Sequence, residues 1–579
     1  MSFSNLKSKR QFKSSKSYVH ASSGPTTTTP THSTTQTPVQ HDSGLLSTPA
    51  GLYKDLPAAL EIRKSSDSGR GLWVREATLK GSVLLSVEPH SFVLSNHYLD
   101  SRCSACVGAA ASSGLKRCMR CRKVWYCNAI CQRNDWPLHK MECAALQRWA
   151  EAAPSDDLSV PSDAVRCLGR ILWQTNLQGV DSTWSREIRA MQSHRKSIQP
   201  SAVEIHTHLA QSLVRYLGLS GPADFEEFGV KSTSDLVDVI SRFITNAFAL
   251  TSPSLTPLGV SVSPLVALTN HSCVPNAVAV FPRSGKTSKK EPVMHVVSLR
   301  DIGPNEEILT AYIDTTLPTP LRQAALMETY SFNCDCTLCK SPSRVDPRVA
   351  ICCPKSCGGV CSMHAEENRR AACDKCYAEI ADLEAVKDVA HIGQEALDKA
   401  TVLQYKDYTK ARQLTTNTIP ILLSAGLAPS CHPLLALLKL HQSLLVTSFS
   451  LKLSQEILDE SIRTAAKHFA GLSAIFDQGH PVRALALAEL GKLLAVDEPS
   501  PSLQTGTFPP SGPTRLKTAY ETLLRARNEL LVGFGSDNDG GEVGQSVRES
   551  TVSLEKELGV WTTGIRNVLK DLPNVRETS

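Results

Sequence analysis

The sequence predicts an α+β multidomain protein in which a β-rich core is interrupted by a cysteine-rich finger and a helical insert, and is followed by an all-α region. Segments near residues 60–88 and 265–314 alternate apolar and polar residues between turns, which is the strand pattern. Seven cysteines and one histidine lie within residues 103–143. Beyond residue 381 or so, apolar residues recur at helical spacing. A chain of 579 residues also exceeds one hydrophobic core, so we expect about three or four domains.

The N-terminal tail differs from the rest in composition. It is rich in Ser, Thr and Pro, and such a stretch buries too little apolar surface to offset the entropy lost on ordering, so we expect disorder. Its charge is basic, with Asp42 as the single acid against Lys7, Lys9, Arg10, Lys13 and Lys16. This start is either a solvated tail, a nuclear signal or an organelle presequence. The chain's net charge of +6 is modest, so it gives no argument for nucleic acid.

The remaining segments follow from changes in pattern. The stretch "EIRKSSDSGRGLWVREATLKGSVLLSVEP" reads as strands and glycine turns, and β character returns in "LVALTNHSCVPNAVAVF" and "NEEILTAYID". Between them, Val165, Leu168, Ile171 and Leu172 share one helix face. The C-terminal helices, such as "HPLLALLKLHQSLLVTSF", suggest stacked antiparallel pairs without a strict repeat. We therefore expect a disordered tail over 1–52, the first part of the core over 58–102, the finger over 103–143, a helical insert over 144–245, the second part of the core over 246–316, a cysteine-rich segment over 317–380 and a helical domain over 381–579.

The finger carries four close pairs of metal-ligand residues in the pattern C-x2-C-x11-C-x2-C-x5-C-x3-C-x7-H-x3-C. Such pairs let one short turn direct two ligands at one metal, and eight ligands suffice for two tetrahedral zinc ions. So short a segment has little core, so metal binding would supply its folding free energy. The predicted ligands are Cys103, Cys106, Cys118, Cys121, Cys127, Cys131, His139 and Cys143.

The surface of the finger offers two further interpretations. Trp125, Tyr126 and Trp136 either form its small core or line a groove for an extended peptide. Its basic residues outnumber its acids, Asp135 and Glu142, which leaves DNA contact open without specifying it. These basic residues are Lys116, Arg117, Arg120, Arg122, Lys123, Arg133 and Lys140.

Cysteine usage also indicates the compartment. Most of the 19 cysteines stand in C-x-C, C-x2-C or C-x3-C pairs, and no secretory signal is visible. We therefore expect thiolate–zinc sites in a reducing compartment rather than disulfides. No stretch approaches eighteen uninterrupted apolar residues, so we expect no membrane span.

Three short motifs carry the chemistry. They are "GRGLW" at Gly69–Trp73, "NHSCVPN" at Asn270–Asn276 and "AYID" at Ala311–Asp314, followed by "YSFNCDCTLC" at 330–339. Each is weak alone, but in this order they resemble the SET domain of protein lysine methyltransferases. With the finger placed after the first motif and a helical C-terminus, the chain is similar to the SET and MYND domain-containing protein lysine methyltransferase family. The resemblance covers residues 58–340 closely and implies a tetratricopeptide-like fold for residues 381–579.

The resemblance implies S-adenosylmethionine as cofactor. The backbone of Gly69, Arg70, Gly71 and Leu72 would receive its methionine end, since glycine lets a ligand approach closely. The same resemblance implies that Asn246, Asn270 and His271 hold the cofactor and that Phe332 packs on its adenine. Tyr312 and Tyr330 would line the channel where the lysine amine meets the methyl group. One departure is Ser68, which stands where the family often has a lysine; Arg70 or Lys64 could replace that charge.

The expected chemistry follows from the reacting groups. A lysine amine must lose its proton before it can attack a methyl group, and its free pKa is about 10.4. A narrow aromatic channel disfavours the ammonium and lowers that pKa. Alignment of the amine, the methyl group and the sulfur supplies most of the remaining rate. We assign Tyr312 to orientation and electrostatics; it need not be a general base.

Two further cysteine groups follow the core. Cys334, Cys336 and Cys339 offer three thiolates, and the resemblance implies Cys273 as the fourth ligand of a post-SET zinc. The second group, Cys353, Cys357, Cys373 and Cys376, has the spacing of a fourth zinc site, with Cys352 and Cys361 as spares. For this group, a zinc site and a remnant without metal remain equal alternatives. Cys167 and Cys431 stand alone on helical patterns and read as buried apolar residues.

The sequence thus predicts a protein-lysine methyltransferase that acts on a histone or non-histone protein. The alternative is an adaptor or transcriptional co-regulator whose finger binds proline-containing peptides, with weak or lost catalysis. We expect a monomer in the nucleus and cytoplasm.

Overall fold

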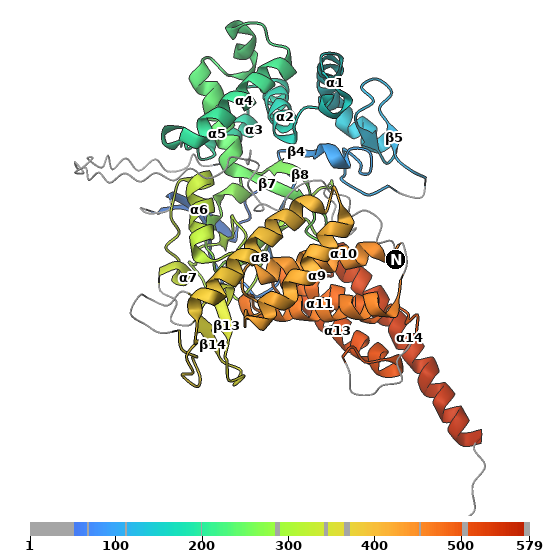
Figure 1. Cartoon of the computed structure of the whole chain (residues 1–579). Coiled ribbons are helices and arrows are strands. Elements are labelled where there is room, and N and C mark those ends of the chain that lie inside the picture. Colours follow the sequence, from blue (N-terminus) through green and yellow to red (C-terminus); the bar gives the residue numbers. More distant parts are fainter. Residues whose placement is uncertain are drawn as a thin grey trace, which may run out of the picture.

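The computed structural model describes residues 51–571, apart from 66–68, 111–112, 199, 284–289, 341–344, 364–370, 451–452 and 501–507. The expected disordered tail therefore lies, but for its last two residues, outside the described part of the chain, and so does Ser68. In Figure 1 the finger and the helical insert lie at one end, the C-terminal helices lie at the other, and most of the strands lie between them.

The β-rich core is built from small sheets that join distant parts of the sequence. The middle strand of one sheet, β8, pairs with β4 from before the finger and with β7 from after the insert. In a second sheet β11 likewise joins β3 to β10. Both sheets thus reunite the two halves of the core around the finger and insert. The bounds are β1 Leu60–Ser65, β2 Gly69–Val74, β3 Val83–Val87, β4 Ser91–Leu94, β7 Ala247–Thr251, β8 Pro257–Val262, β9 Asn270–His271, β10 Ala277–Val280, β11 Met294–Ser298 and β12 Leu309–Thr310.

The sheet β10–β11–β3 is buried on both faces, which explains its apolar sequence. Val296 belongs to the core shared with the finger and insert, whereas its neighbour Val297 packs with the C-terminal helices. Successive strand residues point to opposite faces, so one strand serves two cores. The C-terminal helices thus pack against one face of this sheet.

The finger contains a short hairpin and a long helix. Strands β5 (Lys116–Arg117) and β6 (Trp125–Tyr126) pair, and α1 runs over Ala129–Glu151. The side chain of Asn128 caps α1 by accepting hydrogen bonds from the N–H groups of Ile130 and Cys131. The helix continues beyond the last predicted ligand, Cys143, so one rigid element belongs to the finger and to the insert. The insert adds α2 (Asp163–Gln178), α3 (Thr183–Ala190), α4 (Pro200–Leu217) and α5 (Thr233–Asn246).

The segment after the core is short of regular structure. It holds α6 (Thr319–Tyr330), α7 (Thr337–Lys340), the 3-10 turn η6 (Pro347–Val349) and the hairpin β13 (Ala350–Cys352) and β14 (Val360–Ser362). The other 3-10 turns are Asn96–Tyr98, Asp156–Leu158, Arg195–Ser197, Pro222–Phe228 and Val266–Leu268.

In the described part of the C-terminal region all regular elements are helices, and each helix packs against the next along the chain. The helices are α8 Leu383–Leu403, α9 Tyr408–Ser424, α10 Leu434–Ser448, α11 Gln455–Ile475, α12 Pro481–Leu494, α13 Gly512–Gly533 and α14 Gly541–Asp571. Within the described residues, none of the helices is long and apolar enough to cross a membrane.

Candidate functional site

Asn270 and His271 are positioned by a parallel strand pair, because β9 lies alongside β12. The Asn270 side-chain amide donates one hydrogen bond to Glu307 Oε1 at 2.7 Å and another to the carbonyl oxygen of Arg70 at 3.3 Å. His271 Nδ1 accepts a hydrogen bond from the backbone N–H of Tyr312 at 3.0 Å. Two segments about 200 residues apart in sequence, those of Arg70 and Asn270, are therefore fixed against each other.

Gly71 is crowded by these same side chains. A β-carbon placed on Gly71 would lie 2.2 Å from Glu307 Oε1 and 3.1 Å from Asn270 Nδ2. Only glycine lets the strand approach so closely at this point. Gly69 has a φ of +75° and open space around it, whereas the Leu72 side chain is buried. The predicted cofactor segment is thus a strand edge held close to Asn270.

Four aromatic rings gather beside this strand edge. The ring of Tyr312 lies 5.3 Å from that of His271 and 4.9 Å from that of Tyr330, between centroids. Phe332 completes the group at 5.9 Å from His271. Tyr330 is buried, whereas the other three side chains keep some exposed surface. The structure therefore brings together the predicted lysine-channel and adenine-contacting residues.

The Tyr312 hydroxyl has a defined partner. It donates a hydrogen bond to the carbonyl oxygen of Thr269 at 2.6 Å. Burial, with a contribution from Glu307, raises the pKa of Tyr312 above its usual value. The hydroxyl therefore stays neutral near pH 7, and its oxygen can still accept a hydrogen bond from an amine.

Asn246 and Arg70 are engaged with the helical insert. The Asn246 amide donates to the carbonyl oxygens of Gln192 at 2.8 Å and Arg242 at 2.7 Å. The Arg70 guanidinium donates to the carbonyl oxygen of Ala190. Lys64 pairs with Arg70 across the β1–β2 hairpin and is exposed. Arg70 and Lys64 were the two residues that could supply the charge missing at Ser68. Of these, Arg70 is hydrogen-bonded to the end of α3.

The thiols of Cys273, Cys334, Cys336 and Cys339 form one cluster directly under the aromatic rings. Their sulfur atoms all lie within 4.8 Å of one another, and Cys339 Sγ is 3.6 Å from Cys273 Sγ. Buried Arg322 donates to Cys339 Sγ at 3.7 Å. Because four thiolates around Zn²⁺ carry a net charge of −2, a buried guanidinium is the counter-charge that such a site needs. The donor set therefore fits zinc.

The eight finger ligands separate into two interleaved groups. The first and third pairs, Cys103/Cys106 and Cys127/Cys131, form one cluster, and the second and fourth, Cys118/Cys121 and His139/Cys143, form the other. Cys106 Sγ lies 3.7 Å from Cys127 Sγ, and Cys118 Sγ lies 3.9 Å from Cys143 Sγ. Tetrahedral zinc with bonds of about 2.3 Å spaces sulfurs about 3.8 Å apart, so these distances fit zinc. The spacing predicted the ligands but left their grouping open.

A buried charge network links the finger to the insert. His139 Nδ1 lies 3.0 Å from Glu142 Oε2, and Arg170 of α2 binds both Glu142, at 2.5 Å, and Asp135, at 3.1 Å. The Tyr126 hydroxyl donates to Asp135 at 2.8 Å. Although burial opposes ionisation of Glu142, Arg170 and His139 hold its pKa below its usual range. One guanidinium thus joins the predicted zinc ligand His139 to the insert through Glu142.

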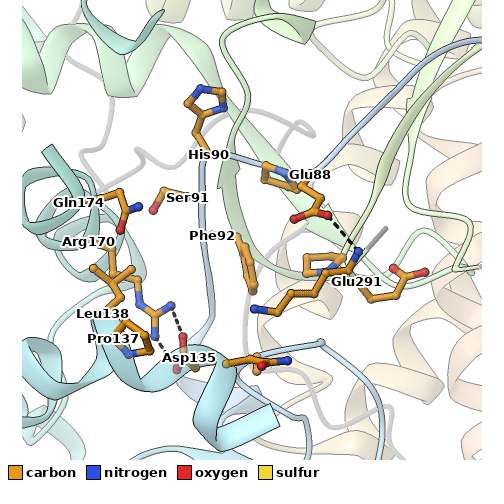
Figure 2. A pocket seen from close by; sticks show the side chains of 15 residues that line it. Glu88, His90, Ser91, Phe92, Asp135, Pro137, Leu138, Arg170, Gln174 and Glu291 are labelled. Carbon is orange, nitrogen blue, oxygen red and sulfur yellow. Dashed lines mark hydrogen bonds and ion pairs between the residues drawn. The ribbon is translucent and has the colours of Figure 1, made fainter. Parts of the chain in front are cut away.

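A cavity of about 310 Å³ lies beside this network, between the finger and the core. Figure 2 shows Asp135 paired with Arg170 on one wall, Glu88 and Glu291 on another, and Phe92 between them. Pro89, Pro137 and Pro292 complete its apolar lining. It contains none of the predicted cofactor or channel residues.

The finger's surface differs in part from the sequence interpretation. Tyr126 is buried and serves as core, whereas Trp136 is 36 % exposed and Trp125 is half-buried under the Arg117 guanidinium. Both acids of the finger are buried in the Arg170 network. The exposed basic residues therefore have no exposed acid of the finger's own to oppose them, although Lys123 binds the Ser159 hydroxyl.

Sequence reasoning missed two residues that organise the site. Glu307 fixes Asn270 and crowds Gly71, yet it appeared only as part of a strand. The sequence did contain a sign of this role, because two adjacent acids, Glu306 and Glu307, precede the strand that leads to Tyr312. Arg170 lies on a helix assigned only by its apolar face, and no local pattern marks an arginine that contacts a finger 28 residues away.

Comparison with known proteins agrees with this architecture. The model of the MYND finger family matches residues 101–143. N-lysine methyltransferase SMYD2-A of Xenopus laevis is 29% identical over 302 residues, which cover 50% of this chain and 64% of that protein. Histone-lysine N-methyltransferase ASHR1 of Arabidopsis thaliana is 28% identical over 374 residues, which cover 61% and 73%. The chain thus spans less than two thirds of the first of these relatives.

A solved SET domain of LSMT bound to lysine and AdoHcy aligns over 86% of this chain and 88% of that one. Its 12% identity and TM-score of 0.25 are too low to carry an argument.

The fold and the finger define a class: a mixed helix and strand protein with an inserted MYND finger and several cysteine clusters suited to zinc. Within that class, the chain carries a MYND finger and is similar, over about half of its length, to N-lysine methyltransferases, in agreement with the resemblance seen in the sequence.

Proposed function

We propose that this protein is a protein-lysine N-methyltransferase that uses S-adenosylmethionine. The observation that carries the proposal is one juxtaposition: the strand edge at Gly71, held by Asn270 and Glu307, lies next to the rings of His271, Tyr312, Tyr330 and Phe332. The strand edge at Gly71 allows the close backbone approach that suits an extended ligand. The group of aromatic rings suits an amine.

The residues fit the cofactor by their chemistry. The polar edge of Gly69–Leu72, with the Asn270 amide, suits an amino-acid end, and Phe332 offers a flat apolar face to a purine. Asn246 supports this edge through the segment after α3. When bound, S-adenosylmethionine supplies a methyl group on a positively charged sulfur. His271 contributes its backbone and fixes the position of Tyr312.

The chain's own residues would prepare the lysine. Tyr312 and Tyr330 surround the amine with aromatic carbon, which disfavours the ammonium form and lowers its pKa. The Tyr312 proton is committed to the Thr269 carbonyl, so the hydroxyl oxygen accepts a hydrogen bond from the neutral amine. That bond would leave the nitrogen lone pair free to face a methyl donor held at the Gly69–Leu72 edge, and alignment would supply most of the rate.

Three zinc ions would support this arrangement. Two hold the finger, in the interleaved groups described above, and the third holds Cys273, Cys334, Cys336 and Cys339. The third ion would tie the Asn270–His271 strand to the segment of Phe332. The site would thus depend on metal for its geometry while the metal takes no part in the reaction.

The predicted domain boundaries and the tetratricopeptide-like assignment of α8–α14 belong to the same proposal. Successive packing of these helices supports stacked helix pairs. The substrate is a protein or peptide that presents a lysine between these helices and the cysteine-rich segment. A proline-containing peptide at the finger is supported by partly exposed Trp136, and contact of the basic surface with DNA has only charge in its favour. We propose a monomer located in the nucleus and cytoplasm.

The test is a titration with S-adenosylmethionine followed by labelled-methyl transfer to a cell extract and mapping of the modified residue. We expect saturable binding and label on lysine side chains. A variant with Asn270→Ala should lose binding, whereas Asn96→Ala should keep it, because the Asn96 side chain binds the Val160 carbonyl and Arg166 instead. Absence of cofactor binding at high micromolar concentration would refute the enzyme and favour the adaptor.

A further inference from the structure

The hairpin after the core carries four thiols that the proposed reaction does not use. Cys353 and Cys357 lie on the turn that joins β13 and β14, and Cys373 and Cys376 lie on a second turn beyond them. Their sulfur atoms all lie within 4.8 Å of one another. We propose that these four cysteines bind a fourth, structural zinc ion.

The sulfur spacing supports a metal rather than disulfides. Cys353 Sγ lies 3.4 Å from Cys376 Sγ, and Cys357 Sγ lies 3.5 Å from Cys373 Sγ. A disulfide needs about 2.05 Å, whereas sulfurs around tetrahedral zinc are about 3.8 Å apart. The corresponding distances in the finger and beneath the aromatic rings are 3.6–3.9 Å. This cluster therefore has nearly the geometry of the other three.

The two turns also have matching local structure. In the first, the N–H of Lys355 points to Cys353 Sγ at 3.4 Å; in the second, the N–H of Lys375 points to Cys373 Sγ at 3.4 Å. Each turn includes a residue with positive φ, Ser356 at 52° and Tyr377 at 59°. Such turns curl the backbone so that N–H groups face the sulfurs, which stabilises thiolates.

The turns are packed together too closely for an incidental contact. A β-carbon on Gly359 would lie 2.5 Å from Cys373 Sγ and 2.6 Å from Asp374 Oδ1. The same Asp374 carboxylate accepts a hydrogen bond from the N–H of Val360 at 2.8 Å. Two turns thus enclose one small volume lined by sulfur. Four thiolates in tetrahedral positions are the donor set typical of structural zinc.

The ion would anchor the hairpin to the C-terminal helices. Strand β13 docks on the segment between α9 and α10: the N–H of Cys352 donates to the Gly426 carbonyl at 2.7 Å, and the N–H of Ala428 donates to the Ala350 carbonyl at 3.1 Å. Ile351 packs in one core with Leu422 and Leu434. The hairpin itself is too short to fold on its own core, so metal binding would supply the free energy that presents β13 for docking.

Metal counting by native mass spectrometry tests the proposal on the full chain. We expect four zinc ions in the wild type and three in Cys376→Ser. The control is Cys352→Ser, because Cys352 is exposed and next to the cluster but outside it; this variant should keep four. A wild-type count of three or fewer in fully reduced protein, four ions in Cys376→Ser, or iron in place of zinc would overturn the proposal.

Alkylation locates the ion independently of the count. Cys352, Cys357 and Cys376 are all exposed, so without a metal they should react at similar rates. We expect Cys352 to react at once, and Cys357 and Cys376 to react only after a chelator is added. Equal rates for all three in the zinc-loaded protein would overturn the proposal. Neither readout depends on methyl transfer.

Discussion

Gly71 shows how one missing β-carbon shapes the candidate site. The space that a side chain would fill is taken by Glu307 and Asn270, whose hydrogen bond fixes the orientation of the asparagine. Any larger residue must push one of them away. The strand edge and the asparagine therefore form one unit.

We predict that Gly71→Ala lowers affinity for S-adenosylmethionine by about tenfold or more and destabilises the fold by about 1–3 kcal/mol, as overpacking does. Isothermal titration and thermal unfolding measure the two effects. Gly221→Ala is the matched control, because a β-carbon at Gly221 meets nothing within 4 Å. Unchanged cofactor affinity in Gly71→Ala would show that this strand edge does not form the cofactor site.

Tyr312→Phe should abolish most methyl transfer while leaving cofactor affinity nearly unchanged. The change removes only a hydroxyl, and it leaves the Thr269 carbonyl without its 2.6 Å partner, which costs about 1–3 kcal/mol of stability. Turnover with saturating cofactor, measured beside a binding titration, separates the two. Wild-type turnover in this variant would contradict the role assigned to the hydroxyl.

At the scale of elements, α1 and α2 are joined by charge as well as by packing. Arg170 is the positive partner of two buried acids on α1. Removing one partner of a buried pair leaves an uncompensated charge, which costs about 3–5 kcal/mol. The finger's orientation thus depends on a residue outside it.

We predict that Arg170→Met accelerates loss of zinc from the finger to a chelator and lowers the thermal midpoint. The reason is that Glu142, released from Arg170, no longer fixes His139. A colorimetric chelator assay gives the rate of release. The control is Arg166→Met on the same helix, since Arg166 is also buried but binds Asn96 and the Leu94 carbonyl. Equal release rates in the two variants would refute a specific link to the zinc ligand.

Elements differ in how far sequence could predict them. The ligand set of the finger was readable because metal geometry restricts spacing to two or three residues. The helical character of α2 could be predicted because Val165, Leu168 and Ile171 recur at helical spacing, although the structure buries every residue from Asp163 to Trp173 and not one face alone. Sequence could not predict how the finger ligands group around two metals, nor the roles of Arg170 and Glu307. Each of these depends on contacts between segments far apart in sequence. Asn270, His271 and the tyrosines were reached through family resemblance, and the structure places them together.

At the scale of the whole molecule, stability should depend on pH through a partly buried histidine. His480 stacks on Phe476 with a centroid distance of 3.8 Å, and burial lowers the pKa of His480 to about 3. The unfolded chain has a histidine pKa of about 6.5. Between these values the unfolded state binds more protons, so stability is complete above pH 6.5 or so and is lost as pH falls toward 3.

We predict that the thermal midpoint of unfolding decreases when the pH is lowered from 7 to 5.5. The decrease should be smaller in His480→Phe, because phenylalanine keeps the ring stacking but cannot take up a proton. The slope from one such group is at most about 1.4 kcal/mol per pH unit. Calorimetry at several pH values measures it. Parallel curves for the two proteins would mean that His480 is not neutral in the fold.

A segment near the C-terminal end of the described chain contacts a segment near its beginning. The N–H of Ser536 donates to the Gly81 carbonyl, and Asn538 meets His295 of β11. During synthesis the ribosome makes about 5–20 residues per second, so Gly81 waits roughly 20–90 s for its partner. Until then no C-terminal helices cover the face of the sheet β10–β11–β3 that carries Val280 and Val297. We therefore expect the nascent chain to expose this apolar face of the sheet to solvent until the C-terminal helices have been made and cover it.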